Sequence, residues 1–299
     1  MDQKKFKSFG GSEIQVEDID RSRIVVLPLC YENSSSYGTG SKKGPYYILD
    51  ASCHLERMDE DELVDWGSLK IHTSQPLFPS DDPQKAVVQM QMEAKNILQR
   101  EKFLLSLGGD HAISIGLIKA ASDIYPDLGV LQIDAHLDMR DTWKGSRYNH
   151  ACVMRRIVED MKLPAIQVGI RSFSPEEAEF AASRNLTPFY AHRIDPTDHA
   201  WIEEAIDALP PRVYLTLDLD GLDPSVIPGT GAPEPGGLSY RQTVQLIKKV
   251  GREKNVVAAD INELIKIDGS NVSEFTAAKI ATKIFVYSWG TGVKIHPAP

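Results

Sequence analysis

The stretch VLQIDAHLD, residues 130–138, joins an apolar run of strand length to two aspartates and a histidine. Two other apolar runs end in the same way, LLSLGGDH at 104–111 and VYLTLDLDG at 213–221. Because side chains alternate along a strand, residues two and four apart point to the same side and can converge on one point. The three runs offer six candidate metal ligands: His111, Asp134, His136, Asp138, Asp218 and Asp220.

The rest of the chain predicts a sheet that places these runs side by side. Apolar runs of strand length at 23–29, 102–109, 128–135, 165–170, 212–220, 255–264 and 283–289 alternate with helical patterns near 83–100, 113–124, 150–161, 175–185, 198–208, 239–253 and 272–282. Strands that are apolar on both faces and separated by helices indicate a three-layer α/β/α fold with a mostly parallel central sheet. In such sheets ligands bind beyond the carboxyl ends of the strands, where all three clusters lie.

Composition and charge indicate the domain number, the kind of binding partner and the cellular location to expect. The chain has 299 residues, 42% of them hydrophobic, and no linker or internal repeat, which predicts a single domain over 1–299. A net charge of −9 without a basic stripe argues against nucleic acid and favours small cationic molecules. No segment has the apolar length of a membrane span or the pattern of a signal peptide. Three irregularly spaced cysteines fit reduced thiols, so we expect a cytoplasmic protein.

The six candidate ligands predict a binuclear metal site. Taken singly, each cluster is also typical of helix caps and turns. Taken together, buried charges without partners would cost several kcal/mol each, which favours bound metal. Oxygen-rich ligation with imidazole and no thiolate favours two Mn²⁺ ions, with Fe²⁺, Co²⁺, Ni²⁺ or Zn²⁺ as substitutes, and two such ions activate a water molecule. Asp138 or Asp218 could bridge them, and we interpret Asp110 as structural.

Four blocks of the sequence resemble the ureohydrolases, the arginase and agmatinase family. They occur in the family's order and are GGDHAIS (108–114), DAHLD (134–138), LDLDGLDPSVIPGTGAPEPGGLS (217–239) and DINEL (260–264). The resemblance implies an arginase-like fold, two manganese ions on the six residues above, and a homo-oligomer, usually a trimer or hexamer. It also implies the hydrolysis of a small cationic guanidine to urea and an amine.

The resemblance further implies catalytic roles for three residues. His150 in SRYNHACVMRR occupies the position of the family's proton-shuttling histidine, and Glu263 matches the acidic residue that holds the guanidinium. Asp138 acts with them through the metal site. The plainer alternatives are a capping or surface histidine at position 150 and a solvated strand-end acid at position 263.

Residues around the predicted site favour agmatine, with putrescine and urea as products. Ser172 and Ser174 stand where arginases typically carry acids, and Arg140 lies in a stretch where arginases favour an asparagine. The loop GAPEPGG at 231–237, with Glu234, is similar to agmatinases. The residues that follow His150 and Glu263 depart from the agmatinase pattern, which leaves aminopropylagmatine, a guanidino acid or arginine open. In particular, Arg140 could pair with a substrate carboxylate or with a nearby acid.

Two other classes of function remain open from the sequence. A metallohydrolase such as an amide deacetylase would use a single zinc, and a non-catalytic homologue would have no reason to keep the ligand set. The segment 31–38 follows the first strand and should lie over the same sheet edge. Its tyrosines and small polar residues suit a substrate-contacting loop and any surface loop equally well.

Overall fold

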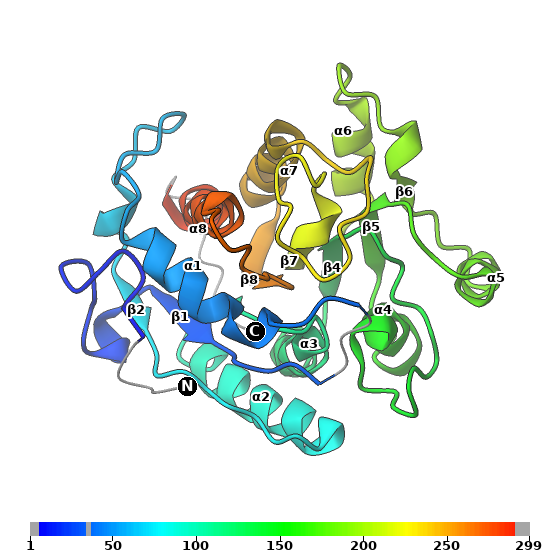
Figure 1. Cartoon of the computed structure of the whole chain (residues 1–299), viewed down its shortest axis with the longest axis horizontal. Helices are drawn as coiled ribbons and strands as arrows, with labels where there is room; N and C mark the ends of the chain where they lie inside the picture. Colours follow the sequence, from blue (N-terminus) through cyan, green and yellow to red (C-terminus); the bar gives the residue numbers. More distant parts are fainter. Residues whose placement is uncertain (1–5, 34–36, 291–299) are drawn as a thin grey trace.

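Eight strands form one sheet in the computed structural model, which describes residues 6–33 and 37–290 (Figure 1). The sheet order is β2-β1-β3-β8-β7-β4-β5-β6, and every pairing is parallel. The strands are β1 (Ile24–Pro28), β2 (Ile71–Thr73), β3 (Phe103–Leu107), β4 (Leu128–Ile133), β5 (Ala165–Ile170), β6 (Phe189–Tyr190), β7 (Arg212–Asp218) and β8 (Asn255–Asn262).

Helices cover both faces of this sheet, which confirms the predicted three-layer α/β/α fold. The α-helices are α1 (Gly44–Ser52), α2 (Pro83–Leu98), α3 (Ile113–Ile124), α4 (Val153–Arg155), α5 (Pro175–Ser183), α6 (Ala200–Asp207), α7 (Tyr240–Glu253) and α8 (Val272–Phe285). Figure 1 shows α1, α6, α7 and α8 on one face and α2, α3 and α4 on the other. Two buried apolar clusters correspond to these two interfaces, one on each face of the sheet.

Helix starts follow the capping signals in the sequence. Ser174 accepts a hydrogen bond from the Glu177 backbone N–H, and the Glu177 side chain accepts from the Ser174 backbone, so a capping box begins α5. Ser239 and Gln242 form the same box at the start of α7. These caps satisfy backbone N–H groups that have no partner within the helix.

The predicted strand at 283–289 is wrong. Helix α8 continues to Phe285, and a π-helical turn follows it at Val286–Gly290. The side chains from Ile284 to Tyr287 are all buried, so the run has no polar face and no helical period in its hydrophobicity. The other predicted strands are confirmed as β1, β3, β4, β5, β7 and β8.

Three short elements were not predicted: β2, β6 and α1. The two strands have only three and two residues, which is too short for a periodic signal. In the described part of the chain, no helix combines the length and the apolar character that a membrane span requires.

Candidate metal centre

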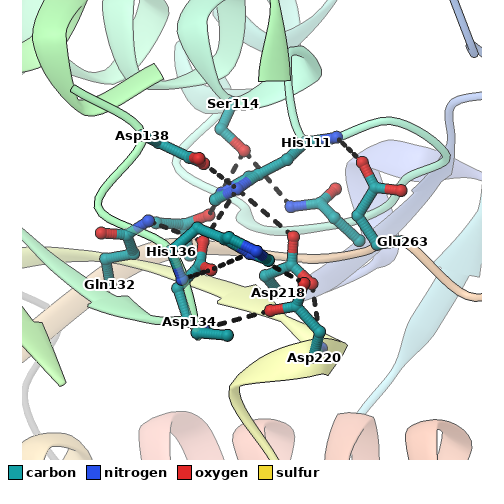
Figure 2. Close-up of polar contacts among 12 residues, drawn as sticks. His111, Ser114, Gln132, Asp134, His136, Asp138, Asp218, Asp220 and Glu263 are labelled. Atoms are coloured by element: carbon teal, nitrogen blue, oxygen red, sulfur yellow. Dashed lines mark hydrogen bonds and ion pairs between the residues drawn. The ribbon is translucent and has the colours of Figure 1, made fainter. Parts of the chain in front are cut away.

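The six candidate ligands converge where β3, β4 and β7 end, as Figure 2 shows. Within the described residues, their ligand atoms form two groups that could each hold a metal ion. The first group is His111, Asp134 and Asp218, and the second is Asp134, His136 and Asp220. The shared member is Asp134, whereas the sequence had suggested Asp138 or Asp218 as the bridge.

The first group is centred on the buried imidazole of His111. Its Nδ1 atom lies 3.2 Å from Asp134 Oδ2 and 3.5 Å from Asp218 Oδ2. Asp138 belongs to neither group, but its Oδ2 atom lies 3.0 Å from the same Nδ1. Three carboxylates therefore face one nitrogen atom (Figure 2).

The second group opens towards solvent. His136 Nδ1 lies 3.1 Å from Asp220 Oδ2 and 3.6 Å from Asp134 Oδ1. The His136 side chain is 29% exposed, whereas Asp134 is fully buried. The two oxygens of Asp134 thus face the two histidines, one in each group.

Loops and turns, not strand alternation, bring these residues together. β4 ends at Ile133, so the segment 134–138 lies beyond the strand, and Asp138 adopts a left-handed backbone with φ of 52°. β7 ends at Asp218, whose side chain accepts the N–H of Asp220 in the following 3₁₀ turn, at 2.9 Å. The predicted convergence is confirmed, but its predicted geometric cause is wrong.

The surroundings of His111 suit a cation. Its Nε2 lies 2.9 Å from the Thr216 hydroxyl, and its buried Nδ1 has no hydrogen-bond partner among the described residues. A bare imidazole nitrogen that faces carboxylate oxygens at 3.0–3.5 Å is repelled unless a positive charge lies between them. Although burial alone would lower the pKa of His111, Asp134 and Asp138 hold it well above its ordinary value.

Two acids of the site, Asp138 and Asp218, lack compensating charge. In contrast, and against the effect of burial, the two histidines of the site lower the pKa of Asp134. Burial, with the added repulsion of Asp134, raises the pKa of Asp138 to about 7. Burial and the neighbouring Asp220 raise the pKa of Asp218 well above its ordinary range. Carboxylates whose ionisation is this unfavourable call for positive charge from outside the chain. The orphaned nitrogen, the buried oxygens and the absence of thiolate fit two divalent cations of the kind that prefer oxygen and imidazole.

A cavity of about 280 Å³ leads to these groups. Its lining includes Asp138, Asp218, Asp220 and His136, together with the predicted catalytic residues His150 and Glu263. Tyr37 and Gly38 of the segment 31–38 also line it, while Ser34–Ser36 lie outside the described residues. Six of the predicted site residues therefore line one cavity, and the other two, His111 and Asp134, lie behind them in contact with each other.

His150 and Glu263 differ in how they are held. His150 begins a 3₁₀ turn that Asn149 caps, and burial lowers the pKa of its imidazole, which favours the neutral form. Glu263 lies in a left-handed backbone with φ of 65°, and its Oε1 accepts the His111 backbone N–H at 2.8 Å. Burial and the nearby charge of Asp110 raise the pKa of Glu263. Asp110 itself accepts the Ala112 N–H at 2.9 Å, which agrees with a structural role.

The residues by which the sequence distinguishes possible substrates lie in or beside the cavity lining. The Ser172 hydroxyl donates to Glu234 Oε1 at 3.0 Å, so the two positions form one unit. The Arg140 guanidinium lies 4.4 Å from the centroid of the Trp143 ring, and its Nε is 3.8 Å from Glu177 Oε2. Arg140 therefore does pair with a nearby acid, Glu177, while Arg140 and Trp143 both line the cavity.

Sequence reasoning missed Arg171, which ties the site loops to β5. Its guanidinium donates to the backbone carbonyls of Gly169, Asp220, Gly221, Leu222, Glu234 and Pro235. The planar fork of arginine suits several acceptors at once. An arginine directly after a buried strand, facing two glycine-rich loops, was the available signal.

Comparison with known proteins agrees with this geometry. The family model described as the arginase family matches residues 22–286. An N(1)-aminopropylagmatine ureohydrolase of Synechocystis is 39% identical over 275 residues, covering 89% of each chain. An agmatinase of Pyrococcus horikoshii is 32% identical over 284 residues, covering 92% of this chain and 95% of its own. The solved structure of an agmatine ureohydrolase of Thermoplasma volcanium superposes with a TM-score of 0.85 at 27% identity, covering 94% of this chain and 95% of that one.

Proposed function

The chain belongs to the arginase family, on its agmatinase-like branch, and we therefore propose that it hydrolyses a small cationic guanidine to urea and an amine. The observation that carries the proposal is the His111 Nδ1 atom, which is buried, without a hydrogen-bond partner in the described chain, and surrounded by three carboxylates. This arrangement is unfavourable by itself and becomes favourable when cations occupy it.

We propose two Mn²⁺ ions per chain, one at each ligand group. The first would be held by His111, Asp134, Asp138 and Asp218, and the second by Asp134, His136 and Asp220. The oxygen-rich donor set supports manganese over zinc, and the absence of cysteine from both groups supports the same choice. When bound, such a pair supplies Lewis acidity and lowers the pKa of a water molecule.

Glu263 and His150 supply the remaining chemistry. The Glu263 carboxylate, fixed by the His111 N–H, holds the guanidinium through charge-assisted hydrogen bonds. Water attacks the guanidino carbon, and the bond from that carbon to the alkyl nitrogen breaks. His150, neutral when the site is empty of substrate, moves a proton to the leaving nitrogen, so that the products are urea and an alkylammonium ion.

For the substrate tail we propose agmatine, with N(1)-aminopropylagmatine as the second candidate. Ser172 stands where an acid would hold an α-amino group, and its hydroxyl is already bound to Glu234, which argues against arginine. The Synechocystis relative favours the longer, aminopropylated substrate. A guanidino acid is disfavoured because Arg140 is already engaged by Glu177 and Trp143.

The other two functions have less support. A single-zinc deacetylase needs one ligand group, whereas the described residues form two that share Asp134. A non-catalytic homologue has no use for buried acids that require cations, or for His150 and Glu263 beside them.

Urea detection after loading with Mn²⁺ tests the proposal. The panel is agmatine, N(1)-aminopropylagmatine, arginine, guanidinobutyrate and free guanidine, each with and without a chelator. We expect metal-dependent urea from one or both of the first two. Confirmed metal binding without urea from any member of the panel would contradict the proposal.

Three further expectations are kept as proposals. These are a single domain over 1–299, a homo-oligomer of three or six chains, and a cytoplasmic location. The three cysteines are free in the structure, which supports a reducing compartment. Light scattering on the purified chain measures the oligomer.

A further inference from the structure

A row of buried polar side chains crosses the sheet beneath the candidate ligands. Four residues in register on adjacent strands connect it to these ligands: Asp260 of β8, Thr216 of β7, Gln132 of β4 and Gln167 of β5. Ser106 of β3 extends the row beside Asp260, and its buried hydroxyl has no partner among the described residues. Each is at most 2% exposed. Gln132 and Thr216 lie two positions before Asp134 and Asp218 in the sequence.

Such a row is unusual in the middle of apolar strands, because buried polar groups are unfavourable unless they are hydrogen-bonded. All four connecting side chains have partners. Gln167 donates to Gln132 Oε1, and Gln132 donates to Asp134 Oδ2 at 2.7 Å. Thr216 Oγ1 lies 2.7 Å from Asp260 Oδ1, and the same Thr216 oxygen lies 2.9 Å from His111 Nε2. Two members of the row, Gln132 and Thr216, therefore contact two of the candidate ligands, Asp134 and His111.

The hydrogen bonds around Asp260 fix the direction of the Thr216 hydroxyl. The Asp260 carboxylate also has three neighbours that can donate to it: Tyr214 Oη at 2.7 Å, Ser114 Oγ at 2.9 Å and Asn262 Nδ2 at 2.6 Å. Thr216 Oγ1 donates to Asp260 Oδ1, so the single hydroxyl proton of Thr216 is directed to Asp260. The Thr216 oxygen is then left to accept, and His111 Nε2 at 2.9 Å is the donor.

The consequence is a defined tautomer of His111. With its proton on Nε2, the imidazole presents a bare Nδ1 to Asp134, Asp138 and Asp218 (Figure 2). The other tautomer would place a proton on Nδ1, bond to a carboxylate and exclude a cation from that position. Partners on the far nitrogen of a metal-binding histidine set both its tautomer and its basicity.

We propose that Thr216 is a positioning residue, which, held by Asp260, keeps His111 in the tautomer that can bind a metal ion. The inference rests on the proposed metal binding and is independent of which guanidine is the substrate. It assigns a role to a strand-interior threonine that is fully buried and does not line the cavity.

Mn²⁺ affinity of matched variants, measured by isothermal titration, tests the role. We expect Thr216→Val, which keeps the side-chain shape and removes the hydroxyl, to weaken binding about 10–100-fold. Thr216→Ser should restore near-wild-type affinity. Tyr214→Phe removes a different partner of Asp260 and should leave affinity unchanged. Wild-type affinity in Thr216→Val, or an equal loss in all three variants, would overturn the proposal.

A spectroscopic measurement on the wild-type chain does not depend on whether a variant folds. With ¹⁵N-labelled histidine and diamagnetic Zn²⁺ bound, the ring nitrogens of His111, assigned with a His111→Asn variant, should show the proton on Nε2. A proton on Nδ1 would overturn both the role of Thr216 and the assignment of His111 Nδ1 as a metal ligand. A wild-type chain that binds no metal would instead overturn the proposed function and this inference with it.

Discussion

Two clusters of carboxylates in this chain obtain their positive charge in different ways. At the strand ends, four aspartates face two histidines. In the turn at 59–62, four consecutive acids face the cationic side chains of α7 and α8. There Lys283 lies 2.7 Å from Asp59 and 2.8 Å from Glu60, and both Lys283 and Asp59 are 1% exposed.

The pKa values of one acid from each cluster, Glu60 and Asp138, move in opposite directions. The hydrogen bond from Lys283 lowers the pKa of Glu60 to about 2, whereas burial raises the pKa of Asp138 to about 7. Among the described residues, no lysine or arginine forms an ion pair with the four strand-end aspartates. Lysine and arginine side chains of the chain itself neutralise the acids of the turn at 59–62. The aspartates at the strand ends instead require cations from solution.

The largest expected effect is on catalysis at the strand ends. Asp218→Ala removes a ligand of the first group, and we expect urea release to fall at least about 10³-fold, because metal ions contribute several kcal/mol of transition-state stabilisation. The assay is urea release from agmatine at saturating Mn²⁺, and Asp138→Ala should behave alike. The matched control is Asp61→Ala in the turn, which should keep wild-type turnover. Equal losses in both clusters would remove the distinction between them.

The next effect is on stability at the turn. Lys283→Met leaves the buried Asp59 carboxylate without its cation, and we expect the free energy of unfolding to fall by about 3–5 kcal/mol. Calorimetry with and without Mn²⁺ should show the same loss. The double variant Asp59→Leu/Lys283→Met should recover most of the stability. A single variant as stable as the wild type would mean that the turn does not depend on its internal cation.

A smaller effect separates the substrate from the metal. Glu263 Oε1 accepts a backbone N–H and, within the described chain, Glu263 pairs with no cationic side chain, so we expect the substrate guanidinium to be its counter-ion. We expect Glu263→Gln to weaken guanidine binding by about 1.5–3 kcal/mol, the value of a hydrogen bond to a charged group. The readout is KM together with metal content, which should stay near that of the wild type. A variant that loses metal and keeps its KM would assign Glu263 to the metal site.

The smallest expected effect is a change in stability that has opposite signs in the absence and in the presence of metal. Asp218→Asn removes one uncompensated charge, so the metal-free protein should gain stability, because burial and Asp220 raise the pKa of Asp218 and make its ionised form unfavourable. In excess Mn²⁺ the same variant should be less stable than the wild type, because it binds the ions more weakly. Thermal unfolding in both conditions measures this. A loss of stability in the metal-free state would show that the charge of Asp218 does not destabilise the metal-free protein.

Much of the fold was predictable because its strands are buried on both faces and leave continuous apolar runs. The same reasoning misassigned residues 283–289, since a helix that is buried on all sides loses its periodicity as well. Short elements such as β2 and β6 depend on their neighbours for hydrogen bonds and carry no signal of their own.

The site was predictable in its members and less so in its geometry. Asp138 reaches His111 through a left-handed backbone, which residue spacing does not reveal. The shared position of Asp134 depends on how two loops cross in space. Thr216 and Gln132 did carry a signal, since each is a polar residue inside an apolar strand, two positions before a candidate ligand.

Metal content and urea release, measured on one preparation, test the central claim most directly. The chain is stripped with a chelator, titrated with Mn²⁺ and assayed with agmatine and N(1)-aminopropylagmatine at each step. We predict that urea release rises with occupancy and reaches its maximum near two ions per chain. Full activity in the stripped chain, or a maximum at one ion, would contradict a strand-end cluster that needs two cations from solution.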